Sequence, residues 1–247
     1  MIPKKIHFCW LSTDSYPRKI ENCIDSWKAL LPDYEIIKWD LNKFPLDKCL
    51  WVEQAYNARK YAFAADYIRL YALATEGGIY LDSDVEVIKP FDDLLSLPYF
   101  ICKENSPQGI EAATIGAEAG CEWIMKCLDY YEGKNFIDSQ GRPNTRVLPS
   151  IIKEIITSNY DIAEVLSPDN IILDNSKVFI LPCDYFSPKN YVTKKIKITN
   201  NTYSVHHFAG TWQPFWKRWL LFLWVPFSVK FPKIASFLKS AKRKSSF

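Results

Sequence analysis

The stretch Gly77–Glu86, with the sequence GGIYLDSDVE, decides how the surrounding chain folds. Its two glycines end the helical pattern that precedes them, because glycine readily adopts the positive φ found at helix C-termini. The apolar run Ile79–Leu81 then predicts a short buried strand. Asp82 and Asp84 follow where that strand ends, and side chains two residues apart on an extended chain point the same way. We therefore expect two carboxylates aimed together at a strand end.

Paired carboxylates in this position favour a divalent cation. Open α/β sheets bind ligands at the carboxyl ends of their strands. Two close carboxylates repel each other unless a cation lies between them, and their hard oxygens suit Mg²⁺ or Mn²⁺. Such an ion keeps open positions that can hold a diphosphate. The alternative is a solvated turn, because Asp-x-Asp is also common by chance.

The first 100 residues alternate between strand and helix patterns. Strands are expected at 5–10, 34–39, 79–81 and 85–88, and helices at 17–31 and, with room for a break, 50–75. This alternation predicts parallel strands joined by right-handed crossovers. The expected fold class is α/β, with a Rossmann-like, mainly parallel nucleotide-binding sheet flanked by helices.

The rest of the chain is divided into an irregular middle and a distinct tail. In the middle, strands are expected at 99–102, 112–115 and 178–181, and helices at 121–131 and 147–157. No repeat or low-complexity linker separates these segments. We therefore expect one catalytic domain, residues 1–214, followed by a tail, residues 215–247.

The tail is basic and rich in aromatic residues. Twelve of the 31 Lys and Arg residues, but none of the 28 acidic residues, follow Asp184. The charge-free run 219–229 is shorter than the ~20 residues that a membrane-spanning helix needs. Tryptophans with basic flanks favour an amphipathic helix on an anionic membrane surface, and the alternative is a helix docked on the core. The apolar residues argue against nucleic acid as a partner.

The composition favours a cytoplasmic globular protein. A hydrophobic fraction of 48% argues against a disordered chain. The seven cysteines include no Cys-x-x-Cys pair, which favours reduced thiols. The first residues show no signal-peptide pattern. Together with the tail, these features predict a protein peripheral on the cytoplasmic face of the membrane.

Asp66 and Arg69 lie upstream of the aspartate pair and share one face of a predicted helix. Their neighbours are apolar, and a charge without a purpose would be costly to bury there. An aspartate that accepts sugar hydroxyls and an arginine near a phosphate would explain both. The alternative is an ordinary intrahelical ion pair, worth only tenths of a kcal/mol.

Three motifs together resemble the DXD glycosyltransferases of the family 32 type: Ile6-His7-Phe8-x-Trp10, Ala65-Asp66-x-x-Arg69 and Gly77-Gly78-x-Tyr80-Leu81-Asp82-x-Asp84. That group includes yeast-type initiating α-mannosyltransferases and bacterial capsule and lipopolysaccharide sugar transferases. The resemblance covers about residues 1–95 and returns near residue 206. It implies a GT-A type fold and a retaining, metal-dependent hexosyltransferase.

The resemblance also implies roles for the matching residues. Trp10 would stack on the nucleotide base, although without the resemblance a tryptophan here would be a core residue. Asp66 and Arg69 would hold the donor sugar and its phosphate, with Arg69 part of the catalytic centre. Tyr80 would line the donor pocket.

The expected metal site combines both ends of the chain. By resemblance, Asp82 would face the ribose and the water shell of the metal, and Asp84 would bind the metal directly. Residues 204–212 are similar to the motif in which a histidine completes the metal site. Spacing to the following glycine and tryptophan favours His207 over His206, and the alternative is two strand-end histidines with one facing inward. A mixed oxygen and nitrogen shell favours Mn²⁺ over Mg²⁺.

The motif after the histidines also suggests two further contacts with the donor. Trp212 would donate its indole N–H to the leaving phosphate, and Thr211 would add a hydroxyl. No nucleophile is nominated. Glu104, Glu111 and Asp138 lie where the motifs give no match, and chance carboxylates are the simplest interpretation of them.

The combined prediction is a retaining, metal-dependent glycosyltransferase. It would move a hexose from a nucleotide sugar, with a UDP-sugar favoured over GDP-mannose, to a lipid-linked or surface glycan. Capsule, exopolysaccharide or lipopolysaccharide synthesis would be its context. The alternatives are a non-catalytic, membrane-bound scaffold that binds sugar nucleotides and a metal-dependent phosphohydrolase. The phosphohydrolase would lack an evident water-activating base.

Overall fold

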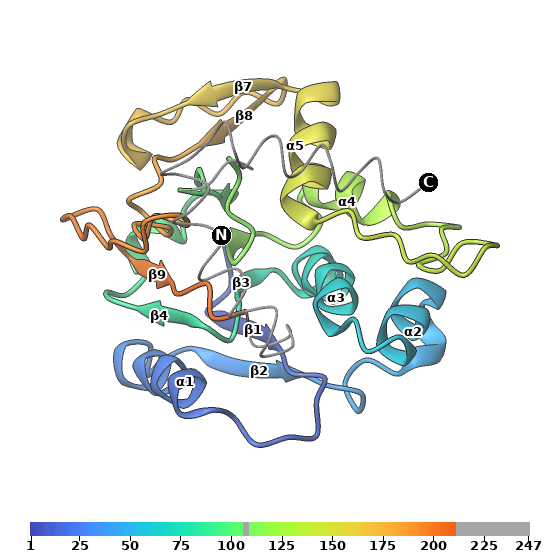
Figure 1. Cartoon of the computed structure of the whole chain (residues 1–247). Coiled ribbons are helices and arrows are strands. Elements are labelled where there is room, and N and C mark those ends of the chain that lie inside the picture. Colours follow the sequence, from blue (N-terminus) through green and yellow to red (C-terminus); the bar gives the residue numbers. More distant parts are fainter. Residues whose placement is uncertain (106–108, 211–247) are drawn as a thin grey trace, which may run out of the picture.

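The structure, a computed structural model, describes residues 1–105 and 109–210 (Figure 1). Its central sheet has the strand order β2-β1-β3-β6-β5. The strands are β1 (Lys5–Cys9), β2 (Glu35–Trp39), β3 (Gly78–Leu81), β5 (Tyr99–Phe100) and β6 (Thr114–Ala117). β1 pairs in parallel with β2 and β3, and only β6 is reversed in this sheet. The predicted α/β fold class with a mainly parallel sheet is therefore confirmed.

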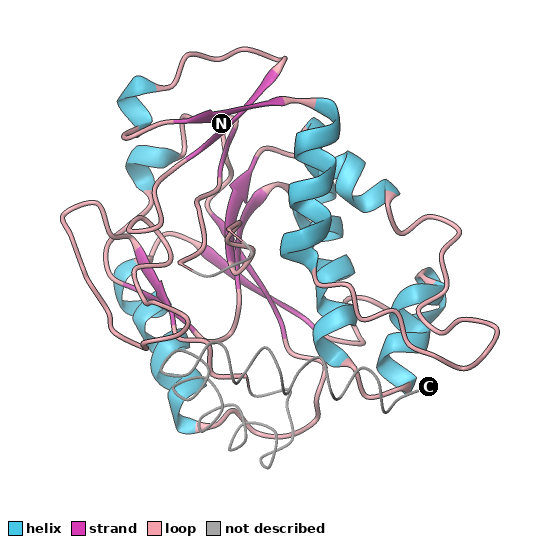
Figure 2. Cartoon of the chain, turned by 45° about the horizontal axis from the view of Figure 1, so that its top comes forward, coloured by secondary structure: helices cyan, strands magenta, loops and turns pink. Residues whose placement is uncertain are grey.

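Helices cover both faces of the sheet (Figures 1 and 2). One face carries α2 (Leu50–Asn57), α3 (Tyr61–Glu76), α4 (Glu122–Asp129) and α5 (Leu148–Asn159), and the other carries α1 (Arg18–Leu30). Successive side chains of β3 point to opposite faces of the sheet and pack against the helices on each face. Tyr80 packs with the α2–α5 side, whereas Ile79 and Leu81 pack with the α1 side.

Two smaller sheets and three 3₁₀ turns complete the described fold. β4 (Val85–Val87) pairs antiparallel with β9 (Ser204–His206), and β7 (Asp161–Glu164) pairs parallel with β8 (Lys177–Ile180). The turns are η1 (Leu46–Lys48), η2 (Asp92–Leu94) and η3 (Pro168–Asn170). β7 and β9 were not among the predicted strands, because both are short and β9 pairs with a strand far away in the sequence.

Backbone conformation and space both require glycine between α3 and β3. Gly77 has a φ of 62° and Gly78 a φ of 111°. A Cβ on Gly77 would lie 2.7 Å from the Ala119 nitrogen, and one on Gly78 would lie 2.8 Å from the Lys5 carbonyl oxygen. The two glycines therefore end the helix and begin the strand, as predicted.

His7 has a structural role and lies away from the aspartate pair in the interior of the sheet. Its Nδ1 accepts a hydrogen bond from the Trp39 indole at 3.0 Å, so its Nε2 donates to the Gly77 carbonyl at 2.7 Å. Burial lowers the pKa of His7, which favours this neutral form. The ring thus joins β1 and β2 to the end of α3.

The described residues do not test the prediction that the tail associates with a membrane. Within residues 1–105 and 109–210, no helix is both long enough and apolar enough to cross a membrane. The predicted tail, 215–247, lies outside the described residues. The boundary after residue 214 therefore stays a prediction.

Candidate functional site

A cavity of about 1090 Å³ opens at the carboxyl ends of β1 and β3. The ends of parallel strands meet at one edge of a sheet, and the loop before antiparallel β6 reaches the same edge. Six residues predicted for the site line this cavity, namely Trp10, Asp66, Arg69, Tyr80, Asp82 and Asp84. The fold therefore brings together residues that are spread over the first third of the chain.

Asp82 and Asp84 lie on a tight turn between β3 and β4. The Asp82 amide donates to the Ala113 carbonyl at 2.8 Å, and the Val85 amide donates to the Asp82 carbonyl at 2.9 Å. The Asp84 carboxylate accepts from the Ala209 amide at 2.6 Å. Backbone contacts from the segments before β6 and after β9 thus hold the aspartate pair.

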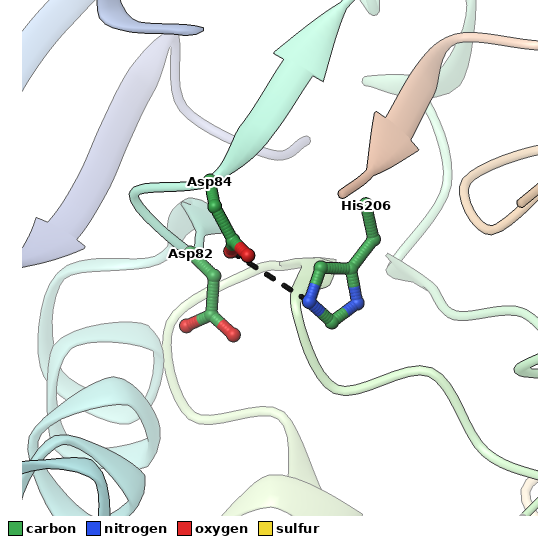
Figure 3. Close-up of side chains that lie close together, drawn as sticks. All are labelled: Asp82, Asp84 and His206. Atoms are coloured by element: carbon green, nitrogen blue, oxygen red, sulfur yellow. Dashed lines mark ion pairs between the residues drawn. The ribbon is translucent and has the colours of Figure 1, made fainter. Parts of the chain in front are cut away.

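An imidazole completes a cluster with the two carboxylates (Figure 3). His206 ends β9, opposite Val85 of β4. Its Nε2 lies 3.6 Å from Asp84 Oδ1, and ligand atoms of Asp82, Asp84 and His206 all lie within 4.8 Å of one another. Carboxylate oxygens and a neutral imidazole nitrogen are donors that Mn²⁺ accepts. The chemistry of this donor set therefore fits a divalent cation.

The structure places His206 in this cluster, and the preference for His207 is corrected accordingly. His207 Nε2 lies 2.7 Å from Glu86 Oε2, and the His207 amide donates to the Asp84 carbonyl at 3.1 Å. Adjacent residues of an extended chain face opposite ways. Spacing to the following glycine therefore does not show which of the two histidines faces the aspartates.

Glu111 is a site residue that the sequence analysis treated as a chance carboxylate. It is fully buried, accepts from the Ala113 amide at 2.7 Å and lies 3.2 Å from His206 Nδ1. A carboxylate on the second nitrogen of an imidazole orients metal-ligating histidines in many sites. Its neighbours Ile110, Ala112 and Ala113 are apolar, so the argument that identified Asp66 would also have identified Glu111.

The charges around His206 determine its protonation in the metal-free protein. Burial lowers the pKa of His206, but the carboxylates of Glu111 and Asp84 outweigh burial and raise it to about 9. Glu104 also lies in this group, within 4.8 Å of Glu111 and His206. Burial and the charge of Glu111 raise the pKa of Glu104. Asp138, by contrast, pairs with Arg142 at 2.9 Å on the surface.

Arg69 binds protein groups at both terminal nitrogens. It donates to the Ala112 carbonyl, lies 2.9 Å from Asp82 and 3.4 Å from Asp66, and packs 4.5 Å above the ring of Tyr80. Only 5% of its surface is exposed. Burial raises the pKa of Asp66 to about 6, against the attraction of Arg69. Arg69 thus positions the two aspartates, and its contact with a phosphate stays a prediction.

Trp10 lies on the cavity wall with one edge fixed. Its indole N–H donates to the Asp14 carbonyl at 3.0 Å, and its ring packs edge-on against Tyr16 at 4.9 Å between centroids. Stacking on a nucleotide base stays a prediction. Thr211 and Trp212 lie outside the described residues.

Part of the chain is similar to known glycosyltransferases. Residues 17–101 match the family described as "Glycosyltransferase sugar-binding region containing DXD motif". "Inositol phosphoceramide mannosyltransferase 3" of Schizosaccharomyces pombe is 33% identical over 131 residues, which cover 51% of this chain and 36% of the relative. "Glucan organizing enzyme 1" of Cryptococcus neoformans is 42% identical over 106 residues, which cover 40% and 29%. The chain thus spans about a third of the length of these relatives.

A solved structure, "PaToxG Glycosyltransferase", has a TM-score of 0.49 and 25% identity, covering 64% of this chain and 68% of its own. The fold and the cluster define an α/β protein with carboxylates and an imidazole at the carboxyl edge of its sheet. Its residues 17–101 match the sugar-binding region of DXD glycosyltransferases, and the relatives similar to this chain include a mannosyltransferase of Schizosaccharomyces pombe. That region contains Asp66, Arg69, Asp82 and Asp84, whereas Glu111 and His206 lie beyond it.

Proposed function

We propose that the protein is a retaining glycosyltransferase of the GT-A type that requires a divalent cation and a nucleotide sugar. One observation carries this proposal. The two carboxylates of the DXD motif lie beside an imidazole from the far end of the described chain, on the wall of a cavity large enough for a nucleotide sugar. A solvated turn would not need a buried glutamate to orient that imidazole.

The residues that line the cavity would have different roles in donor binding. Asp82, Asp84 and His206 would hold Mn²⁺ or Mg²⁺, and a bound divalent cation offsets negative charge on a leaving diphosphate. Asp66 would accept hydrogen bonds from the donor sugar. Arg69 would keep Asp66 and Asp82 in place. Trp10 would stack on the base, as the resemblance implies.

A hexose donor attached to UDP is our first candidate, and GDP-mannose is the second. The mannosyltransferase names of several relatives support keeping GDP-mannose in the comparison. The acceptor would be a lipid-linked or surface glycan, as in capsule, exopolysaccharide or lipopolysaccharide synthesis. The lipid in the names of these relatives and the basic aromatic tail support that class.

We also propose that the tail binds anionic membrane at its cytoplasmic face. Its eight basic residues between Lys217 and Lys244 include no acidic neighbour to offset them. Truncation after Pro214 should abolish co-sedimentation with anionic vesicles and leave donor hydrolysis largely intact. Vesicle binding that survives the truncation would contradict this part of the proposal.

A screen of UDP- and GDP-sugars, each with and without Mn²⁺, tests the function. A donor should raise the unfolding temperature only when Mn²⁺ is present, since a ligand that binds the folded state stabilises it. The same donor should then release its nucleoside diphosphate on incubation with an acceptor extract. Binding without turnover would support the non-catalytic scaffold, and no stabilisation by any nucleotide would contradict both.

A further inference from the structure

Three lysines lie near one another beside the cluster of Asp82, Asp84 and His206. Lys19 lies in the first turn of α1, and Lys189 and Lys194 belong to the hairpin 188–197. The side chain of Asn190 closes the tip of this hairpin. It accepts hydrogen bonds from the Val192 amide at 3.0 Å and from the Thr193 amide at 2.8 Å. Residues 191–194 then form part of the cavity wall.

Contacts with two other loops fix the hairpin in place. The Asn190 side chain donates to the Asn105 side chain at 2.8 Å, and the Tyr191 amide donates to the Asn105 carbonyl at 2.9 Å. The ring of Tyr191 packs edge-on against Phe208 at 5.2 Å, and Phe208 lies 4.0 Å from the ring of His206. The hairpin is therefore packed against the same segment that supplies the metal-ligating imidazole.

Lys194 and His206 both lie against the ring of Phe208. Its Nζ is 4.4 Å from the ring centre of Tyr191 and 5.7 Å from that of Phe208. Lys194 and Phe208 have φ values of 59° and 51°. Positive φ is uncommon outside glycine, and such backbone strain gathers at ligand sites. The strained backbone of Lys194 and the nearby rings of Tyr191 and Phe208 thus place an ammonium group at the cavity wall.

This lysine group lacks carboxylate ion pairs in the described part of the chain, and the charge of Asp84 acts on Lys189 without forming one. Within residues 1–105 and 109–210, none of the three lysines forms an ion pair with an acidic side chain. Lys189 donates instead to the His207 carbonyl at 2.7 Å. Burial, and then the charge of Lys19, lower the pKa of both Lys189 and Lys194. Lys189 is half-buried, whereas Lys19 and Lys194 are exposed. A group of cations without carboxylate ion pairs favours an anionic ligand.

We infer that Lys194, with Lys189 and Lys19 behind it, is the cationic subsite for the diphosphate of the nucleotide donor. The inference rests on the proposed function and assigns to the hairpin a contact that the sequence had suggested for Arg69. The guanidinium of Arg69 is buried and binds Ala112, Asp66 and Asp82. Lys194 faces the cavity on the side of His206, where a diphosphate held by the metal would lie.

The test compares nucleotide and nucleoside binding in matched variants. Calorimetric titration with UDP and with uridine, in saturating Mn²⁺, is applied to the full chain and to Lys194→Ala, Lys194→Arg and Lys195→Ala. GDP and guanosine replace them if the donor screen selects that base. Lys195 is the control because it is adjacent in sequence and exposed like Lys194, but is not part of the cavity wall.

We expect Lys194→Ala to weaken UDP binding by about 10- to 100-fold, as for other lost charge-assisted contacts. Uridine affinity should stay the same, Lys194→Arg should restore most of the UDP affinity, and Lys195→Ala should change neither. A purely structural role would weaken uridine and UDP together.

Three results would overturn the inference. Equal losses for uridine and UDP would show that Lys194 only supports the hairpin. Unchanged UDP affinity in Lys194→Ala would assign the lysines to a different anion, such as a phosphate on the acceptor. Failure of the unmodified chain to bind any nucleoside diphosphate would overturn the proposed function itself, and the subsite with it.

Discussion

The two walls of the cavity are built in different ways. The first wall, within residues 1–87, consists of consecutive strands and helices, and its carboxylates follow directly from the ends of those elements. The second wall comes from separate segments, 102–105, 109–113, 188–197 and 204–209, joined by long-range hydrogen bonds and ring contacts. Local sequence therefore places the first wall, whereas tertiary contacts place the second.

The walls also differ in charge. The first wall supplies Asp66, Asp82 and Asp84, with Arg69 already bound to protein groups. The second supplies an imidazole and Lys194, together with the carboxylates of Glu104 and Glu111 that surround the imidazole. A cation and an anionic diphosphate would therefore be held between the walls, and neither wall would suffice alone. The following predictions test that division.

The largest effect is expected on the first wall. Asp84→Asn should lower turnover of the donor by about 10³-fold or more, because it removes a negative ligand from the cation that offsets the leaving-group charge. Turnover is measured as nucleoside diphosphate release, with Asp138→Asn as a surface control. Near-normal turnover in a folded Asp84→Asn protein would show that the DXD wall is not the catalytic centre.

The histidine pair tests the second wall. His206→Ala should weaken Mn²⁺ binding by about 100-fold, whereas His207→Ala should change it by less than about threefold. Of the two histidines, it is His206 that lies with Asp82 and Asp84 in the cluster of possible metal ligands. Electron paramagnetic resonance of free and bound Mn²⁺ measures both. The reverse order of effects would restore the original preference for His207.

The smallest effect concerns pH. The pKa of His206 in the metal-free protein is raised to about 9, so a proton must leave when a metal binds. Mn²⁺ affinity should therefore rise by about tenfold per pH unit between pH 7 and 9 and level off above. The same shift stabilises the metal-free fold fully below the ordinary pKa of about 6.5, and this stabilisation is lost as the pH rises through about 9.

Two measurements check the pH prediction. Calorimetry in buffers of different ionisation enthalpy should show about one proton released per Mn²⁺ bound at pH 7. His206→Gln should remove both the proton release and the corresponding part of the pH dependence. A flat Mn²⁺ affinity from pH 7 to 9 in the unmodified protein would contradict the assignment of His206 as a protonated ligand.

Much of the first wall could be predicted because its signals are local. Gly77 and Gly78 end a helix through their backbone conformation, and the end of β3 places Asp82 and Asp84 at the sheet edge, although a tight turn and not strand alternation brings them together. Glu111 was within reach of the same reasoning, since a carboxylate in an apolar run needs a partner. The partner itself, His206, lies 95 residues away, and nothing in the local pattern names it.

Other features depended on contacts that no local pattern contains. The pairing of Val85 with His206 decides which histidine faces the aspartates. Lys194 is one of twelve basic residues after Asp184, and only the fold of its hairpin against Phe208 distinguishes it from Lys195. The predicted phosphate contact of Arg69 is a similar case, because the local sequence does not show that Ala112, Asp66 and Asp82 surround its guanidinium.

Local patterns in the chain predicted the α/β fold class, the break between α3 and β3, and the carboxylate pair at the strand end. Periodicity, glycine conformation and burial act over a few residues, so the chain carries them at each position. Only the tertiary structure decided that His206, Glu111 and Lys194 complete the cavity. Their positions depend on strand register and loop packing between segments far apart in the chain, which are set by the free energy of the whole fold.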